Sequence, residues 1–283
     1  MLWFVLLSSL PLYADNFNII LNNQLPLRSN YELDVLTLAL ETTKSEYGDF
    51  TIKTMESGYT ISRQIKVAQE SPDIILWASP YHSINTSLTI IEYPLFNGIF
   101  GLRGIVLHKS KLNDFNRVKN VDDLRKYTIA QGPGWMDVSI YKNSGFIVFE
   151  ARLKKLFNMA SQQRFDLLPL GIIEIDDETL KSKKGGNDLI IAPNHMIYYP
   201  HPVLFHLNQK HTKAISRLND GMQEITRNGS LAALFEQRFP HVTAKLKQPG
   251  MTVISIENNF LPGRYLRATK GSAILHNLNI VEQ

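Results

Sequence analysis

Residues 128–137 read Thr128-Ile-Ala-Gln-Gly-Pro-Gly-Trp-Met-Asp137. The apolar residues before them predict a short strand at 127–130, which runs into a Gly132-Pro133-Gly134 turn and a helix at 135–141. Glycines let the backbone bend tightly and let a ligand approach it, while the first N–H groups of a helix attract an anion. The stretch therefore predicts a seat for a small carboxylate, with an ordinary strand-to-helix turn as the alternative. It lacks the third glycine of a dinucleotide fingerprint and the Lys-Ser/Thr of a phosphate loop.

The chain before this stretch alternates strands and helices. Apolar runs predict strands at 17–21 and 73–77, and alternation of apolar and polar residues predicts one at 51–55. Ser29 and Glu32 have the spacing of a capping box and predict a helix that ends at Gly48. A second helix is predicted from Ile61. This strand–helix order indicates a mostly parallel sheet with helices on its faces.

The same alternation restarts after an irregular loop. Strands are predicted at 100–107, 146–149, 165–168 and 188–192, with helices at 122–126, 151–160 and 174–183 between them. Residues 196–207 are extended and apolar, and a long helix ends at Asn228-Gly229. Beyond Pro240 only the run at 252–256 resembles a strand. The two successive series of alternating strands and helices predict an α/β protein with two lobes.

Composition narrows the class of protein. The 283 residues are 44% hydrophobic and carry a net charge of +4, which fits a globular chain. Its basic residues are scattered, whereas a nucleic-acid-binding protein needs a broad basic face. We therefore expect no nucleic acid partner. The chain has no cysteine, so it contains neither a disulfide nor a thiol nucleophile.

The first residues form an apolar run that ends at Ala14, before polar Asp15 and Asn16. The run is too short to span a bilayer and fits the core and cleavage site of a secretory signal. Residues 1–14 are thus predicted to be a signal peptide. They lack the positively charged residues that usually begin a signal peptide, which indicates that the true first residue lies upstream of Met1. The alternative is a first buried strand or helix.

Catalytic and metal-binding patterns are missing from the sequence. No pair of histidines has the spacing of a zinc protease, and no Gly-x-Ser-x-Gly elbow is present. The acids at 174–178 lie at a predicted helix start, where carboxylates favour the helix dipole. We expect no cofactor, no metal and no enzymatic activity.

Three motifs resemble one family. They are Ile91-Glu-Tyr-Pro-Leu-Phe-Asn-Gly-Ile-Phe-Gly-Leu-Arg103, Gly132-Pro-Gly-Trp-Met-Asp137 and Arg164-Phe-Asp-Leu-Leu-Pro-Leu-Gly-Ile-Ile-Glu174. With the order of elements, they resemble the family 3 periplasmic solute-binding proteins of amino-acid ABC transporters, which have the type II periplasmic binding fold. The resemblance covers roughly residues 15–240 and is nearest to an uncharacterised proteobacterial branch.

The resemblance implies two lobes that close on a small solute. The first lobe would hold residues 15–103 plus 196–283, and residues 104–195 would form an inserted second lobe. In the amino-acid binders, an arginine after the third strand holds the ligand carboxylate. The loop at 76–87 has no arginine here, and Arg103 is the nearest substitute. A hinge arginine paired with a local acid is the alternative.

The resemblance and the motifs together give a set of candidate ligand-binding residues. Each has a structural alternative: packing for the aromatic residues, a helix cap for Glu174 and Asp137, and a structural ion pair for Arg164 with Asp166. The candidates are Arg103, Gly134, Trp135, Asp137, Arg164, Asp166, Glu174 and Tyr198, while neighbouring Tyr199 and His201 are expected to line the same cleft.

The predicted function is binding of a small polar ligand, an amino acid or related carboxylate, in the periplasm. The protein would deliver it to a membrane permease, as a monomer without a lipid anchor. A sensor that signals to a membrane partner is the first alternative, and an enzyme with Glu174 or Asp137 as general base is the second. Arg103 and the turn at 132–137 are expected to hold the ligand from opposite lobes, so that Arg103→Ala weakens binding and leaves the fold intact.

Overall fold

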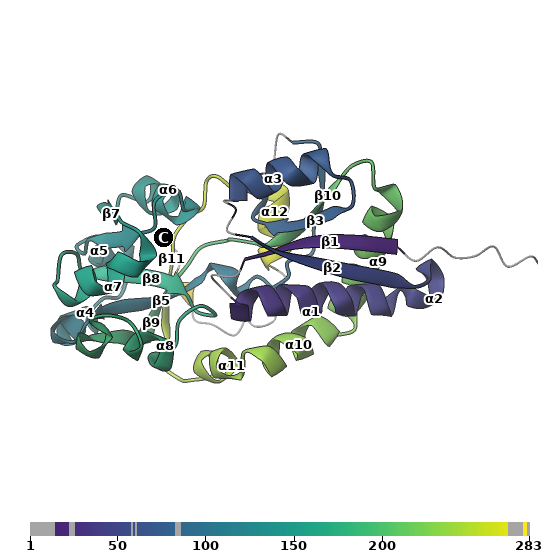
Figure 1. The fold of residues 1–283 in the computed structure, drawn as a ribbon. Coiled ribbons are helices and arrows are strands. Elements are labelled where there is room, and N and C mark those ends of the chain that lie inside the picture. Colours follow the sequence, from purple (N-terminus) through teal and green to yellow (C-terminus); the bar gives the residue numbers. More distant parts are fainter. Residues whose placement is uncertain are drawn as a thin grey trace, which may run out of the picture. The chain divides into compact units, whose positions relative to one another are not determined.

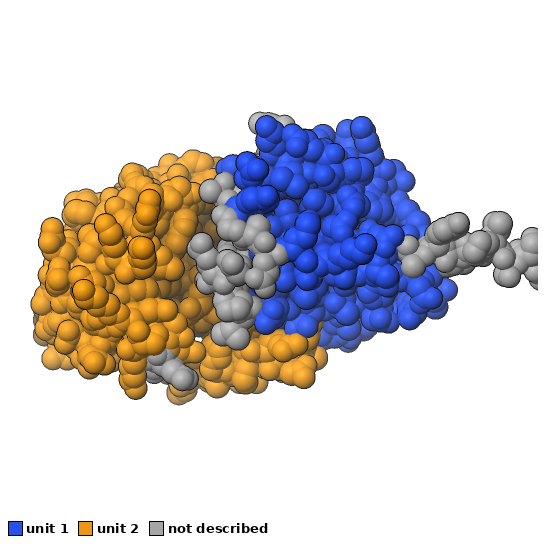
Figure 2. Space-filling model, viewed as in Figure 1, with its two compact units in different colours: residues 1–78, 82–93, 205–231 blue, residues 79–81, 94–204, 232–283 orange. Residues whose placement is uncertain are grey.

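The computed structural model describes residues 15–22, 26–57, 59, 61–82, 86–270 and 280–281. The predicted signal peptide lies outside these residues. The chain divides into two compact units (Figure 2). Unit 1 contains residues 1–78, 82–93 and 205–231, and unit 2 contains residues 79–81, 94–204 and 232–283.

Unit 1 is built on a five-stranded sheet. Its strands, in spatial order, are β2 (Phe50–Ser57), β1 (Asp15–Asn22), β3 (Ile74–Ala78), β10 (Leu204–Asn208) and β4 (Leu88–Ile91). β1 pairs in parallel with β2 and β3, as the strand–helix order predicts. β10 pairs antiparallel with β4. The sheet is therefore mixed, and a late strand completes it.

Helices cover both faces of this sheet. They are α1 (Pro26–Thr42), α2 (Lys44–Tyr47), α3 (Ile61–Glu70) and α9 (Thr212–Arg227). α1 and α3 lie on opposite faces (Figure 1), and α9 packs against α1. The contact with α1 is close, because a Cβ on Gly221 of α9 would lie 2.3 Å from the carbonyl oxygen of Ala39.

The predicted capping box at Ser29 is wrong. α1 begins at Pro26, a residue that suits the first turn of a helix because it has no N–H to leave unpaired. Ser29 is buried inside α1, and Glu32 pairs with Arg28 at 2.8 Å rather than turning back to cap the helix. The predicted single helix is divided in two, because α1 ends at Thr42 and a short second helix, α2, follows it. The stop at Gly48, whose φ is 87°, is confirmed as the end of α2.

Unit 2 is built on a seven-stranded sheet. Its strands, in spatial order, are β12 (Ile280–Val281), β11 (Thr252–Ser255), β9 (Leu189–Tyr198), β5 (Leu102–His108), β8 (Leu167–Gly171), β6 (Ile129–Gln131) and β7 (Val148–Glu150). β5 runs antiparallel to both β8 and β9, whereas β6 is parallel to β7 and β8.

Strand alternation gives unit 2 a core on each face of its sheet. Ile105 and Leu107 of β5 belong to one cluster, with Phe115 and Tyr141. Val106, between them, belongs to the other cluster, which contains residues of α7 and α8. Successive residues of a strand point to opposite faces, so a sheet covered on both sides needs such continuous apolar runs.

The remaining helices belong to unit 2, except that η1 and α10 have residues in both units. The short 3₁₀ turns are η1 (Pro80–His82), η2 (Ile99–Gly101), η3 (Lys109–Lys111) and η4 (Gly186–Asp188). The α-helices are α4 (Leu112–Phe115), α5 (Val121–Leu124), α6 (Met136–Asn143), α7 (Leu153–Ser161), α8 (Asp177–Lys181), α10 (Ser230–Arg238), α11 (Pro240–Leu246) and α12 (Gly263–Lys270). Of the helices described, none combines the length and apolar character needed to cross a membrane.

The limits of the units differ from the expected lobe boundaries. Residues 94–103 and 196–204, together with everything from residue 232, group with unit 2. The predicted strand near the end of the chain exists as β11, and it pairs with β9. α11 and α12 were not predicted. The division into ligand-closing lobes stays a prediction.

Candidate functional site

Several carboxyl ends of strands meet at one edge of the unit 2 sheet. β8 and β9 both run opposite to β5, and β6 runs with β8. The ends of β6, β8 and β9 therefore lie beside the start of β5, at Leu102 and Arg103. In open α/β sheets, ligands bind outside the carboxyl ends of the strands. This edge is the candidate site of unit 2.

Arg103 is the centre of a buried polar network, which we call the Arg103 cluster (Arg103, Asp137, Tyr199, His201 and Tyr81). Its side chain is 4% exposed and pairs with an Asp137 carboxylate oxygen at 3.0 Å. Its Nε donates to the Tyr199 hydroxyl at 2.6 Å, and its Nη2 lies 3.3 Å from His201 Nδ1. Opposite Arg103 in the sheet, a Cβ on Gly171 would come within 3.1 Å of Nη1, so a glycine leaves room for the guanidinium.

Asp137 is held from two sides. It is the second residue of α6, where an acid suits the helix dipole, and it accepts a hydrogen bond from the Tyr199 hydroxyl. Burial alone would raise the pKa of Asp137, but Arg103, His201 and the Tyr199 hydroxyl outweigh burial and lower that pKa below its usual value. Asp137 is thus a carboxylate at neutral pH, with its charge balanced by Arg103.

Aromatic rings enclose the pair. The guanidinium carbon of Arg103 lies 5.0 Å from the Tyr199 ring centre and 5.5 Å from that of Phe100. His201 Nε2 lies 3.0 Å from the Tyr81 hydroxyl. The two ring nitrogens of His201 thus contact Arg103 and Tyr81, one on each side of the ring. Burial raises the pKa of Tyr199 well above its usual value, so its hydroxyl stays protonated.

The glycine turn before α6 carries an exposed tryptophan. Gly134 has a φ of 78°, which favours glycine. A Cβ on Gly132 would lie 2.4 Å from Cε2 of Trp135, so the first glycine lets the indole fold back over its own turn. Trp135 is nevertheless 37% exposed, among the most exposed large apolar side chains described. The turn therefore presents an indole to solvent beside the Arg103 cluster, whose Asp137 lies two residues further on.

Two more polar groups lie at this edge. Gln131, at the end of β6, is buried and donates to the Pro169 carbonyl at 2.7 Å. Its Oε1 finds no hydrogen-bond partner among the described residues. Glu174 follows β8, with Oε2 2.7 Å from where a Cβ of Gly171 would lie. The sequence did not single out Gln131, Tyr81 or Phe100, because no spacing rule connects the ends of separate strands.

The other candidates lie elsewhere. Asp166 precedes β8, at the opposite edge of the sheet, and accepts hydrogen bonds from the Thr128 N–H at 2.7 Å and the Thr128 hydroxyl at 2.6 Å. It pairs with Lys111 rather than with Arg164, which is exposed. Tyr198 adjoins Tyr199, but strand alternation turns it to the other face of the sheet. These three side chains do not join the Arg103 cluster.

The expected arrangement of Arg103 and Asp137 is wrong. The sequence placed them in opposite lobes, with a ligand between them. Both lie in unit 2 and contact each other, so neither presents an unpaired charge. The alternative of an arginine paired with a local acid fits this geometry. In the described part of the chain, no group of three or more His, Cys, Asp or Glu is placed to hold a metal ion.

The hydrogen bonds of Asp166 should make the stability of the fold depend on pH. Burial would raise its pKa, but hydrogen bonds from Lys111 and Thr128 outweigh burial and lower the pKa below its usual value. A lowered folded-state pKa stabilises the fold above the unfolded-state value of about 3.9, and the benefit is lost as the pH falls below it. Asp166→Asn should therefore cost about 1 kcal/mol at pH 7, since the ion pair is partly screened, and less than that at pH 2.

Urea unfolding at both pH values measures this difference. Asp114→Asn is the matched control, because Asp114 is 76% exposed and lies 3.7 Å from Arg117. It should change stability little at either pH. An equal loss for Asp166→Asn at pH 7 and pH 2 would contradict the prediction.

Comparisons with solved structures identify the fold. The ligand-binding core of GluR0 in complex with L-glutamate matches with a TM-score of 0.57 at 15% identity, over 80% of this chain and 97% of that one. The VFT2 domain of BvgS from Bordetella pertussis matches with a TM-score of 0.56 at 16% identity, over 79% and 93%. An amino-acid ABC transporter substrate-binding protein, AbpA from Streptococcus pneumoniae, bound to L-arginine, matches with a TM-score of 0.53 at 11% identity, over 81% and 96%.

No protein-family model and no curated protein sequence matches the chain. At these identities the structural matches show the fold alone. The predicted α/β, periplasmic-binding-protein-like fold is confirmed.

Proposed function

We propose that this chain, which has the fold of amino-acid substrate-binding proteins, binds a small polar solute in the periplasm. The solute would be an amino acid or a related carboxylate, and the protein would close on it and deliver it to a membrane transporter. The observation that carries the proposal is the candidate site: three strand ends, an exposed Trp135 on a glycine turn and a rigid polar network behind it. Neighbours of this fold include a protein bound to L-arginine and one bound to L-glutamate.

The residues at this edge divide into two roles. Arg103 and Asp137 neutralise each other, so we assign them to holding the start of α6 in place rather than to clamping a zwitterion. Gly134, Trp135 and Glu174 are the proposed contacts. They would supply a backbone N–H for an acceptor, an indole for stacking and a carboxylate, which also interacts with the charge of Arg103, for an ammonium group. A few such polar anchors beside an apolar surface suffice for a small ligand. Arg164, Asp166 and Tyr198 have no part in this proposal.

A thermal-shift screen tests the binding function. Ligand that binds only the folded state stabilises it by about 2.7 kcal/mol at 100 times the dissociation constant. The screen would use the 20 common amino acids, polyamines and small organic acids. A rise in melting temperature with one class supports the proposal. No response from well-folded protein to any of them would contradict it.

Trp135→Ala should weaken ligand binding by about ten- to a hundredfold, the equivalent of about 1.4–2.8 kcal/mol. The reason is that a stacked indole loses its contact area and its aromatic interaction together. Isothermal titration with the ligand found in the screen measures the change. Phe149→Ala is the matched control, since Phe149 is 43% exposed in unit 2 and lies on edge strand β7. Equal affinities of the two variants would remove Trp135 from the site.

A ligand sensor is the first alternative. Its support is the match to the VFT2 domain of BvgS. Transport and sensing share the binding step and differ in the membrane partner. Neighbouring genes for a permease and an ATPase would favour delivery, and a signalling protein would favour sensing. Light scattering tests the expected monomer, and small-angle scattering with and without ligand tests closure.

An enzyme of the same fold is the second alternative. Asp137 makes a poor general base at neutral pH, because its pKa is lowered and its charge is paired. Glu174 is the remaining candidate of the two. Recovery of the ligand unchanged after prolonged incubation with the protein would argue against catalysis.

A further inference from the structure

A concave region lies in unit 2, away from the candidate site. It has a volume of about 660 Å³ and is open to solvent. Its walls come from the first half of β9, from η4, from the end of α8 and from α11. Lys109 follows the end of β5, and His108 is opposite Leu189 at the start of β9. We call this region the lysine groove. It lies toward the sheet edge opposite Arg103.

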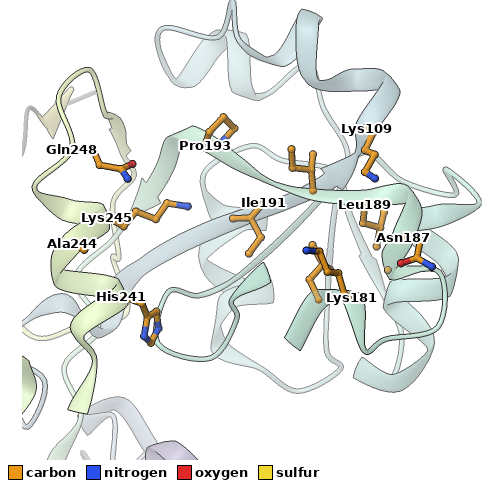
Figure 3. Close-up of a pocket in the computed structure, with 13 residues that line it drawn as sticks. Lys109, Lys181, Asn187, Leu189, Ile191, Pro193, His241, Ala244, Lys245 and Gln248 are labelled. Atoms are coloured by element: carbon orange, nitrogen blue, oxygen red, sulfur yellow. The ribbon is translucent and has the colours of Figure 1, made fainter. Parts of the chain in front are cut away.

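Among the side chains that the structure describes, the charged ones lining the lysine groove are all basic. They are Lys109, Lys181 and Lys245, which line it together with His241. Lys109 and Lys181 are exposed and have no ion pair with any described carboxylate. Figure 3 shows Lys181 and Lys245 extending from opposite sides toward Ile191. The groove thus gathers positive charge from three separate elements.

The floor of the groove is apolar. Leu180, Leu189 and Ile191 are 2%, 3% and 8% exposed and belong to one core cluster of unit 2. Pro193 and Ala244, both exposed, extend this apolar surface to the rim. A simple inorganic anion would leave the exposed apolar rim at Pro193 and Ala244 in contact with water. A neutral apolar molecule would leave Lys109 and Lys181 without an acidic partner among the described residues.

We propose that the lysine groove binds an amphiphilic organic anion. The apolar body of the ligand lies on Leu189, Ile191 and Pro193, and its acid group lies among the lysine ammonium groups. The volume is within the range of small-molecule sites, about 300–1,000 Å³. Both halves of the ligand are needed, because burial of apolar surface supplies the attraction and the lysines fix the orientation. This site is independent of the proposed solute-binding function.

Titration calorimetry on the intact chain with octyl sulfate, below its micelle-forming concentration, tests the proposal. We expect binding of one molecule per chain, which weakens as salt is raised from 50 to 500 mM because charge pairs are screened. Inorganic sulfate and octyltrimethylammonium should each bind at least tenfold more weakly. Equal affinity for inorganic sulfate, or for the cationic amphiphile, would overturn the proposal.

Two variants locate the binding. The double variant Lys109→Glu, Lys181→Glu should weaken octyl sulfate binding at least tenfold. Ala244→Glu should act in the same direction, since it places a carboxylate in the groove at an exposed helical position while keeping every lysine. The matched control is Lys53→Glu, Lys66→Glu, which reverses two exposed lysines of unit 1.

The control changes the net charge by the same amount as the double variant in the groove. An equal loss of octyl sulfate affinity in the control would therefore overturn the assignment to the groove. Unchanged binding by both groove variants would overturn it too. Trp135→Ala should bind octyl sulfate like the unaltered chain. A failure of the amino-acid screen therefore leaves this test intact, and the two proposals can fail separately.

Discussion

Replacing Arg103 with methionine is expected to lower the free energy of unfolding by about 3–5 kcal/mol, because Asp137 then stays buried without its cation. This differs from the expectation based on the sequence, in which the arginine holds a ligand and its loss leaves the fold intact. Denaturant unfolding of the intact chain, followed by circular dichroism, measures the loss. Arg117→Met is the matched control, since its side chain is 82% exposed, and it should cost less than about 0.5 kcal/mol.

A double variant separates charge balance from packing. With Arg103→Met and Asp137→Leu together, neither charge remains, and replacing a buried ion pair by apolar side chains is often nearly neutral. Most of the stability should return. The Tyr199 hydroxyl then loses both partners at a residual cost of about 1–3 kcal/mol, and adding Tyr199→Phe should remove part of it. If Arg103→Met stays fully stable and loses only ligand affinity, Arg103 is a ligand contact and the structural role is wrong.

Arg217→Ala should be as damaging in unit 1, at about 3–5 kcal/mol. Its side chain is 0% exposed and pairs with Asp15 at 2.8 Å. It also donates to the carbonyl oxygens of Gly48 at 2.8 Å and Leu40 at 3.1 Å. Removing it leaves three acceptors from three elements without this donor, along with a cavity beside Phe50. Denaturant unfolding measures the effect.

Lys213 provides a control on the same carboxylate. It pairs with the other Asp15 oxygen at 2.8 Å, but its side chain is 50% exposed. Lys213→Ala should cost no more than about 1 kcal/mol, the usual range for surface ion pairs. Similar losses for the two variants would mean that burial and the two carbonyl contacts add little, and would contradict the structural role of Arg217.

Much of the fold could be predicted because it depends on local patterns. Strands β1, β3 and β5 and helix α9 follow from apolar runs and helical spacing, and Gly48 ends its helix where expected. The antiparallel direction of β5 could not be predicted. A strand's direction depends on which neighbours it joins, and those neighbours, β8 and β9, come much later in the chain.

The sequence predicted the glycine turn of the candidate site but not the ion pair between Arg103 and Asp137. The glycines at 132 and 134 indicate a tight turn whatever surrounds them, and Trp135 does lie on that turn. The partner of Arg103 depends on the three-dimensional approach of Asp137, 34 residues away, and of Tyr199, 96 residues away. Charge alone could not choose between Asp137 and other acids such as Glu174. Helices α11 and α12 were missed because the tail shows only short apolar runs.

Strand β10 has a consequence for how the chain folds during synthesis. It lies between β3 and β4 in the unit 1 sheet, yet β3 ends at Ala78 and β10 begins at Leu204. At about 5–20 residues per second, roughly 6–25 s separate their appearance from the ribosome. During that interval β3 has an open edge, whereas β5 to β9 of unit 2 emerge as one uninterrupted segment. Strands β5 to β8 of unit 2 can thus pair during that interval, whereas unit 1 stays incomplete until its missing strand arrives.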